Sequence, residues 1–100
     1  MTAEAEGYRD QLRAMLPELR ARFGVAALGL FGSRVRGDHR PDSDLDVLVT
    51  FEPGRTPGLI TFGTLEGVIA DRLGVAVDLV PGDCLRSHVE PSVRREVQYI

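Results

Sequence analysis

Two aspartates, Asp44 and Asp46, lie two residues apart at the start of an apolar run that ends at Phe51. This run predicts a strand over residues 44–51, and residues i and i+2 of a strand point to the same face. The two carboxylates then face one way, with Cα atoms about 6.5 Å apart, while Leu45 and Val47 face the other way and can be buried. Like charges placed this way need a counter-cation, and Mg²⁺ is the cation that suits hard oxygen ligands.

A third carboxylate, Asp78, lies inside the apolar run VAVDLV, which predicts a strand over residues 75–80 that ends at Pro81-Gly82. If this strand pairs beside the strand over 44–51, Asp78 comes within about 5 Å of the acidic pair, one strand spacing. Three such carboxylates can hold two divalent cations, which lie roughly 3.5–4 Å apart in sites of this kind. Two cations can bind a triphosphate, activate a hydroxyl nucleophile and neutralise a pyrophosphate leaving group. Because the carboxylates repel one another, at least one should have a raised pKa without metal.

A possible phosphate-binding turn, Gly32-Ser33, follows the strand predicted over residues 25–31. Glycine lets the backbone approach a ligand closely, and the N–H groups of the next turn can contact phosphate oxygens. Just beyond, the guanidinium groups of Arg34 and Arg36 either contact a phosphate or are solvated surface charges. Ser43, directly before the acidic pair, is expected to contribute to nucleotide binding by orienting a carboxylate, or to cap the loop.

The other elements follow from hydrophobic periodicity. Residues 3–23 read as a helix that ends at Gly24, in which Pro17 predicts either a kink or two helical pieces. A single helical turn is expected from Ser33 to about Asp38. Thr56 is expected to cap a second helix with Pro57 in its first turn. This helix is weakened by two glycines and ends at Leu73 and Gly74, and its apolar stripe is Leu59, Phe62, Leu65, Ile69 and Leu73.

Short helices are expected over residues 85–89 and 91–97, and residues 98–100 either pair as a strand or trail off. The order of elements predicts an α+β fold, a small mixed β-sheet with helices packed on one face, in one domain over residues 1–100.

Composition narrows the class of protein. The formal charge is −3, which argues against extensive direct nucleic-acid binding. All 12 basic residues are arginine, which excludes a P-loop kinase and Schiff-base chemistry. The single cysteine, Cys84, suits a reducing compartment and is expected to be a packing residue. No apolar run is long enough to span a membrane, so the expected location is cytoplasmic. His39 and His88 are isolated and lack metal-ligand spacing.

These motifs together resemble the minimal nucleotidyltransferases of the DNA polymerase β superfamily. Their signature is Gly-Ser, ten residues, Asp-x-Asp, and a later Asp on another strand. Here it reads Gly32-Ser33, residues 34–43, Asp44-Leu45-Asp46 and then Asp78. The stretch RGDHRPDSDLD, residues 36–46, is similar to the family pattern in which Arg-Gly is followed, after a variable spacer, by Ser-Asp-x-Asp. One departure is Val35, where the family often has alanine.

The resemblance implies a polymerase-β-like palm and Mg²⁺-dependent transfer of a nucleoside monophosphate, commonly AMP from ATP, to a hydroxyl. It implies that Asp44 and Asp46 bind two Mg²⁺ ions, that Asp78 completes one metal site and acts as base, and that Gly32 and Ser33 bind phosphate. Short chains of the family often act as antitoxins paired with a HEPN ribonuclease toxin in a hetero-oligomer, and some of them adenylylate a tyrosine of that partner.

Three functions stay open at this point. The first is an active transferase that modifies a protein partner, which would have to supply part of the site because the chain is small. The second is a catalytically inactive antitoxin that acts by binding alone. The third is a transferase acting on RNA ends or on a small molecule. The alternative to all three is that the aspartates have no catalytic role, so that Asp44 merely ends a loop and Asp46 lies on an exposed face of the sheet.

Overall fold

A computed structural model of the chain describes residues 1–82 and 96–100. In chain order the elements are α1 (Ala3–Phe23), β1 (Val25–Phe31), α2 (Ser33–Arg36), β2 (Leu45–Phe51), α3 (Leu59–Leu73), β3 (Val77–Pro81) and β4 (Gln98–Tyr99). Within these two ranges, no helix is both long and apolar enough to cross a membrane.

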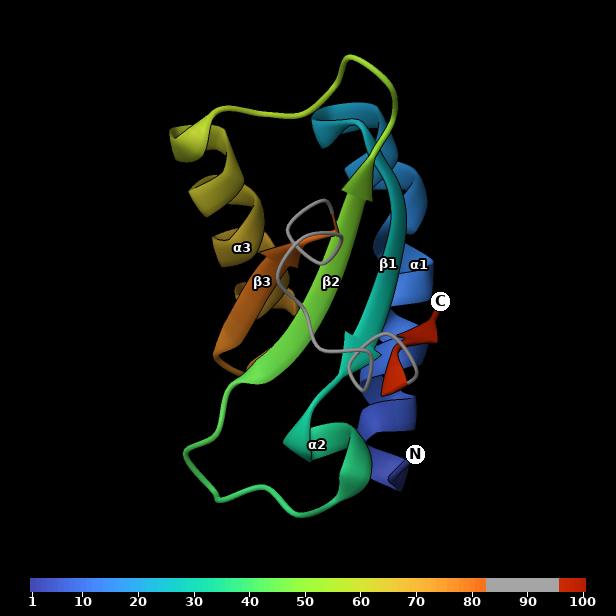
Figure 1. Cartoon of the computed structure of the whole chain (residues 1–100), viewed down its shortest axis with the longest axis vertical. Helices are drawn as coiled ribbons and strands as arrows, with labels where there is room; N and C mark the ends of the chain where they lie inside the picture. The colour runs from blue at the N-terminus through green and yellow to red at the C-terminus, as the bar shows by residue number, and fades with distance from the viewer. Residues whose placement is uncertain (83–95) are drawn as a thin grey trace.

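The four strands form one mixed sheet in the order β3-β2-β1-β4. The strand β1 pairs antiparallel with both β2 and β4, whereas β2 and β3 run parallel. Figure 1 shows α2 and the loop that follows it at one end of the long β1–β2 pair, and the loop that leads to α3 at the other end. The predicted α+β fold with a small mixed sheet is confirmed.

The main core lies between the sheet and the two long helices. Side chains of α1 and α3 pack in one cluster with alternate residues of the three longer strands. Among the described residues, the largest fully buried side chains are Leu12, Leu19, Val25, Leu28, Leu30, Leu45, Val47, Val49, Leu65 and Ile69. Both helices therefore cover the same face of the sheet, as predicted. The opposite face carries a smaller cluster, in which Leu48 and Val97 are buried beside Phe31 and Val80.

The first helix is continuous from Ala3 to Phe23 even though Pro17 lies inside it. The alternative of two helical pieces is therefore wrong. The Thr2 side chain accepts a hydrogen bond from the N–H of Ala5 at the N-terminus, and Gly24 ends the helix in the left-handed conformation with φ 74°. One proline removes one backbone donor, and the buried stripe on either side of it is enough to hold a long helix together.

The second long helix begins later than its sequence suggests. Its first hydrogen bond runs from the N–H of Phe62 to the carbonyl of Gly58, 2.9 Å, so Gly58 is the N-cap and the predicted cap at Thr56 is wrong. The predicted apolar stripe is buried at Leu65, Ile69 and Leu73, but Leu59 is 88% exposed. Periodicity alone cannot show that the first turn of the helix lies beyond the core.

Three strand boundaries differ in detail from expectation. The strand β2 starts at Leu45, so Asp44 is the last loop residue rather than the first strand residue. The strand β3 runs from Val77 to Pro81 and not from residue 75 to 80. Gln98 and Tyr99 pair with β1 as β4, which decides between the two alternatives for the C-terminal residues. The helix predicted over 85–89, most of the one predicted over 91–97, Cys84 and His88 lie outside the described residues.

Candidate active site

Two of the predicted site residues, Asp46 and Asp78, lie opposite each other on neighbouring strands. The parallel pairing of β2 and β3 matches Leu45 with Val77 and Asp46 with Asp78. Residues paired in this way point to the same face of a sheet, about one strand spacing of 4.8 Å apart. Since Val77 and Leu79 are buried in the core and Asp78 is exposed, the aspartates point away from the helices. The predicted pairing that brings Asp78 beside the acidic pair is therefore confirmed.

Asp44 lies beside this pair, at the end of the loop that leads into β2. It is exposed and lies one residue before β2, whose first backbone N–H, that of Leu45, donates to the carbonyl of Ala76 at 2.8 Å. This hydrogen bond joins the start of β2 to the segment that enters β3. Asp44 is close enough to Asp46 that its negative charge contributes to the raised pKa of the Asp46 carboxyl.

Burial and the mutual repulsion of the three carboxylates have their clearest effect on the pKa of Asp46. Its pKa is raised from 3.8 to about 6, first because burial disfavours the charged form and then because of the charges of Asp78 and Asp44. The positive charge of Arg36 acts in the opposite direction. Asp46 is thus the half-buried member of an acidic group with Arg36 nearby, which is an arrangement that attracts a cation.

The glycine of the predicted phosphate turn is required by geometry. Gly32 has φ 84° and ψ −164°, a backbone conformation essentially restricted to glycine. A Cβ atom built on Gly32 would overlap the carboxylate of Asp46 and lie 2.9 Å from its Cγ. The backbone of the turn therefore lies directly against the central carboxylate, where only glycine fits.

The turn that follows is the four-residue helix α2, with Gly32 as N-cap. Its first intrahelical bonds are made by the N–H groups of Val35 and Arg36, which both donate to the carbonyl of Gly32 at 3.1 and 3.2 Å. The N–H groups of Ser33 and Arg34 come before these bonds at the start of the helix, where backbone donors point outward. They have the position that the sequence predicts for contacts with phosphate oxygens.

The two arginines near the turn behave differently. Arg36 is exposed and pairs with Asp38 at 3.2 Å and with both Glu96 oxygens at 3.0 and 3.1 Å. The hydrogen bond to Asp38, and then the charges of Asp38 and Glu96, raise the pKa of Arg36 above its ordinary value. Arg34 is only 8% exposed, so the expectation that it is a solvated charge or a phosphate contact is wrong.

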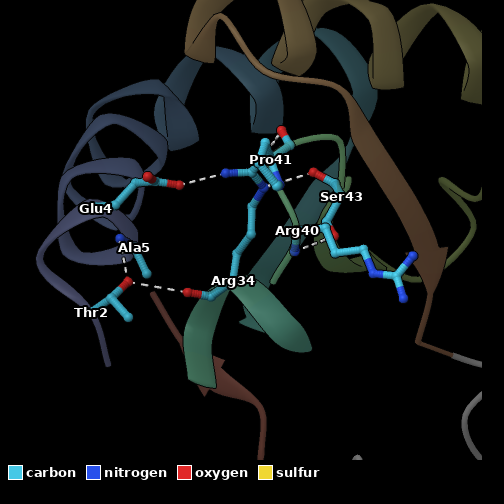
Figure 2. Close-up of polar contacts among 7 residues, drawn as sticks. All are labelled: Thr2, Glu4, Ala5, Arg34, Arg40, Pro41 and Ser43. Atoms are coloured by element: carbon cyan, nitrogen blue, oxygen red, sulfur yellow. Dashed lines mark hydrogen bonds and ion pairs between the residues drawn. The ribbon is translucent and has the colours of Figure 1, made fainter. Parts of the chain in front are cut away.

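Each of the three nitrogens of the Arg34 guanidinium instead donates a hydrogen bond to the protein. Its Nε donates to the carbonyl of Ser43 at 2.7 Å, Nη1 donates to Glu4 Oε1 at 2.6 Å, and Nη2 donates to the carbonyl of Pro41 at 3.3 Å (Figure 2). Ser43 itself caps the loop, because its Oγ accepts the N–H of Arg40 at 3.0 Å. That contact is the loop cap that the sequence offered as one role for Ser43.

The fit of a metal ion can be judged from these positions. In residues 1–82 and 96–100, no group of three or more Asp, Glu, His or Cys side chains lies close enough together to hold a metal ion by itself. Mg²⁺ is usually bound by one or two carboxylates together with substrate phosphates, and not by an all-protein cage. The pair Asp46 and Asp78, with Asp44 beside it and a backbone turn for phosphates opposite, fits that type of site.

A separate apolar pocket of about 330 Å³ lies at the other end of β2, lined by Phe51, Thr56, Pro57, Gly58, Leu59, Phe62 and Pro81. Along β2, Phe51 of the pocket is five residues from Asp46, and along β3, Pro81 of the pocket is three residues from Asp78, at roughly 3.3 Å per residue. The pocket contains no carboxylate and is not part of this site.

Sequence reasoning missed two polar contacts near the site. The first is the bond between Arg34 and Glu4, which no spacing rule connects because 30 residues separate them. The second is Glu66 on α3, whose Oε2 accepts the backbone N–H of Leu79 at 3.0 Å, next to Asp78 on the outer strand. The available signal for the second contact was the position of Glu66, directly after the buried Leu65 and four residues after Phe62, at the edge of the apolar stripe of α3.

A mixed sheet with two aspartates in parallel register, a third at the strand entrance and a glycine-only turn against them defines a nucleotidyltransferase fold. Comparison with known proteins agrees with this class. Residues 12–99 match the family model described as "Nucleotidyltransferase domain". The protein adenylyltransferase MntA of Thermococcus cleftensis is 47% identical over 89 residues, which are 89% of this chain and 88% of that protein.

Solved structures give the same result. A chain proposed to be a minimal nucleotidyltransferase superposes with a TM-score of 0.71 at 41% identity, covering 93% of this chain and 92% of that one. A chain from a toxin–antitoxin crystal structure with AMP-PNP superposes with a TM-score of 0.67 at 25% identity, covering 91% and 70%. The protein described here therefore belongs to the nucleotidyltransferase family, as an enzyme of the minimal nucleotidyltransferase type.

Proposed function

We propose that this chain transfers AMP from ATP to a hydroxyl of a partner protein, with Mg²⁺, and that the acceptor is a tyrosine of a HEPN ribonuclease toxin that the modification silences. The observation that carries the proposal is the register between Asp46 and Asp78 directly against the backbone of Gly32. This arrangement combines a cation-attracting carboxylate pair with a turn suited to phosphate oxygens.

Each part of the site has a distinct role in this reaction. Asp44, Asp46 and Asp78 would hold Mg²⁺, two ions in the family pattern, and the metal would neutralise triphosphate charge and assist departure of pyrophosphate. The N–H groups after Gly32, with the Ser33 hydroxyl, orient the phosphates.

Two further side chains act around the triphosphate. Arg36 adds a positive charge, for which phosphate oxygens compete with Asp38 and Glu96. Ser43 supports nucleotide binding by closing the loop that leads to Asp44.

The transfer itself is a single displacement. The acceptor oxygen forms a bond to the α-phosphorus, and the bond from that phosphorus to the oxygen bridging to the β-phosphate breaks. The proton of the acceptor hydroxyl passes to the Asp78 carboxylate, and pyrophosphate leaves. Asp78 suits the role of base because it is on the outer strand and exposed, where an acceptor can reach it.

A protein acceptor is supported by relatives and by the shape of the site. The relative at 47% identity is named a protein adenylyltransferase, and one structural neighbour is part of a toxin–antitoxin complex with AMP-PNP. In the described part of the chain the acidic group lies on the face of the sheet that α1 and α3 leave open. A partner chain can therefore supply the rest of the site from that side. ATP as the donor and the single cysteine both fit the cytoplasm.

The test is to co-express the chain with a candidate HEPN ribonuclease, add ATP and Mg²⁺ to the purified pair, and weigh both proteins by mass spectrometry. The partner should gain AMP, and the gain should vanish with Asp44→Asn. Asp42→Asn makes the same chemical change two residues upstream on an exposed loop position and should keep the transfer. If cells remain protected from the toxin by the Asp44→Asn chain, and no AMP is added by the natural chain, the protein is an antitoxin that acts by binding alone.

A cheaper first check needs no partner. Binding of ATP, measured by calorimetry, should depend on Mg²⁺ and should be lost with Asp46→Asn. Equal ATP affinity in both proteins would contradict the role of this carboxylate.

A further inference from the structure

The loop that joins α2 to β2 ends at Asp44, so its conformation decides where Asp44 lies, whereas Asp46 is held by its strand pairing with Phe31 and Asp78. The loop covers residues 37–44 and is mostly exposed. Within the loop, Ser43 and Arg40 exchange two hydrogen bonds of 3.0 Å. These contacts close the tip of the loop but do not connect it to the rest of the fold.

The connection is made by Arg34. Its guanidinium binds two carbonyl groups of the loop, those of Ser43 at 2.7 Å and of Pro41 at 3.3 Å. The carbonyl of Ser43 belongs to the peptide unit that leads directly into Asp44. The short bond from Arg34 therefore fixes the orientation of the peptide from which Asp44 projects.

Arg34 is itself held from two directions, as Figure 2 shows. Glu4 of α1 accepts from Nη1 at 2.6 Å, and the Thr2 hydroxyl donates to the carbonyl of Arg34 at 3.1 Å. The Arg34 side chain is 9% exposed and the Glu4 side chain 45% exposed. Burying a cation costs free energy unless it is paired and hydrogen-bonded, and these contacts supply both a carboxylate partner and hydrogen bonds.

The same residue also belongs to the phosphate turn, because it follows Ser33 at the start of α2. One side chain thus connects the turn proposed to bind phosphates with the loop that presents Asp44. A planar guanidinium can donate to two carbonyls and a carboxylate at once from fixed directions, whereas an ammonium group cannot reproduce that fork.

We infer that Arg34 is a positioning residue for the transfer, which holds Asp44 at a set distance from the Gly32-Ser33 turn, with Glu4 as its anchor. The inference rests on the proposed function for its catalytic consequence, but its structural part can be tested without it. Misplacement of reacting groups by about 1 Å can cost up to about 100-fold in rate, so a clamp of this kind affects kcat more than substrate affinity.

The experiment compares Arg34→Lys and Glu4→Gln with the natural chain, all as full-length proteins. Arg72→Lys is the matched control. Arg72 of α3 also donates two hydrogen bonds to a carboxylate of α1, that of Glu18, but this ion pair does not involve the loop. Amide hydrogen exchange is measured by mass spectrometry for each, without nucleotide. With Arg34→Lys, exchange in residues 40–46 should speed up about tenfold or more while α3 keeps its protection.

The second readout is steady-state AMP transfer to the partner. For Arg34→Lys, kcat should fall about 10- to 100-fold while KM for ATP stays within about twofold, and Glu4→Gln should show the same pattern more weakly. If the substitution simply unfolded the protein, exchange would speed up throughout the chain and not in this loop alone. If Arg34→Lys does not fold, the exposed change Glu4→Gln carries the test.

Unchanged exchange in residues 40–46 would overturn the inference, and so would a kcat equal to that of Arg72→Lys. If the natural chain transfers no AMP, the proposed function fails, while the exchange data still decide whether Arg34 holds the loop.

Discussion

Replacing Asp46 by asparagine should make the protein more stable at neutral pH while it abolishes AMP transfer. The pKa of Asp46 is about 6 in the folded chain, compared with an ordinary value of 3.8. The causes are burial, then the charges of Asp78 and Asp44, and all three disappear or weaken when the carboxyl becomes an amide. The site thus contains a charge that the fold holds at a cost in stability.

The sign and size follow from proton linkage. Because the folded pKa is raised, the native state binds more protons than the unfolded state between about pH 4 and pH 6. Stability therefore falls as pH rises through this window, and the full penalty applies above it. A shift of about two units corresponds to at most about 3 kcal/mol, at 1.36 kcal/mol per unit. Since Asp46 is only half-buried and water screens part of the effect, we expect Asp46→Asn to stabilise by about 1–2 kcal/mol at pH 7.5.

The assay is thermal unfolding of the metal-free protein at pH 5 and at pH 7.5. For a domain of this size, 1 kcal/mol shifts Tm by about 4–8 °C, so the gain is measurable. The variant should also lose most of the decline in Tm between the two pH values. Asp10→Asn, the same change at an exposed position of α1, should leave the difference between pH 5 and pH 7.5 unaltered. A variant less stable than the natural chain at pH 7.5 would refute the reasoning.

Further predictions concern the turn, the base and the outer strand. Gly32→Ala should destabilise the chain by about 1–3 kcal/mol in urea unfolding, because its conformation is restricted to glycine. Gly67→Ala, in a helix interior with open space around it, should instead stabilise by about 0.5–1 kcal/mol. Asp78→Asn should lower kcat for AMP transfer by about 10²–10⁴-fold with folding intact, as expected for loss of a general base. Glu66→Ala should destabilise by about 1–3 kcal/mol, because it removes the partner of the Leu79 N–H.

Much of the architecture could be predicted from local patterns. Periodicity located both long helices and all three main strands, since buried faces impose a period of 3.6 or 2 on apolar residues. Errors occurred at ends, as at Thr56, Leu59 and Asp44. At an end of an element, the number of residues that reach the core depends on where the other layers stop, and that is not a local property.

The residues of the candidate site could be proposed from the sequence where the type of side chain alone indicates the chemistry. Asp44, Asp46, Asp78 and Gly32 were found because carboxylates in apolar strands and a glycine after a strand are unusual and specific features. Arg34 was misread because an arginine beside a phosphate turn has the same sequence context whether it binds a ligand or the protein's own carbonyls. Only burial, here 8% exposure, separates the two cases.

The sequence by itself determined which chemistry is possible, because side-chain type and strand periodicity set the three carboxylates, the glycine turn and the face to which each residue points. Only the tertiary structure decided that Asp46 meets Asp78 in register, since the pairing of β2 with β3 depends on how the intervening α3 packs over the sheet. It also decided that Arg34 reaches both Glu4 and Ser43. Those contacts join residues distant in the chain, and no local pattern records them.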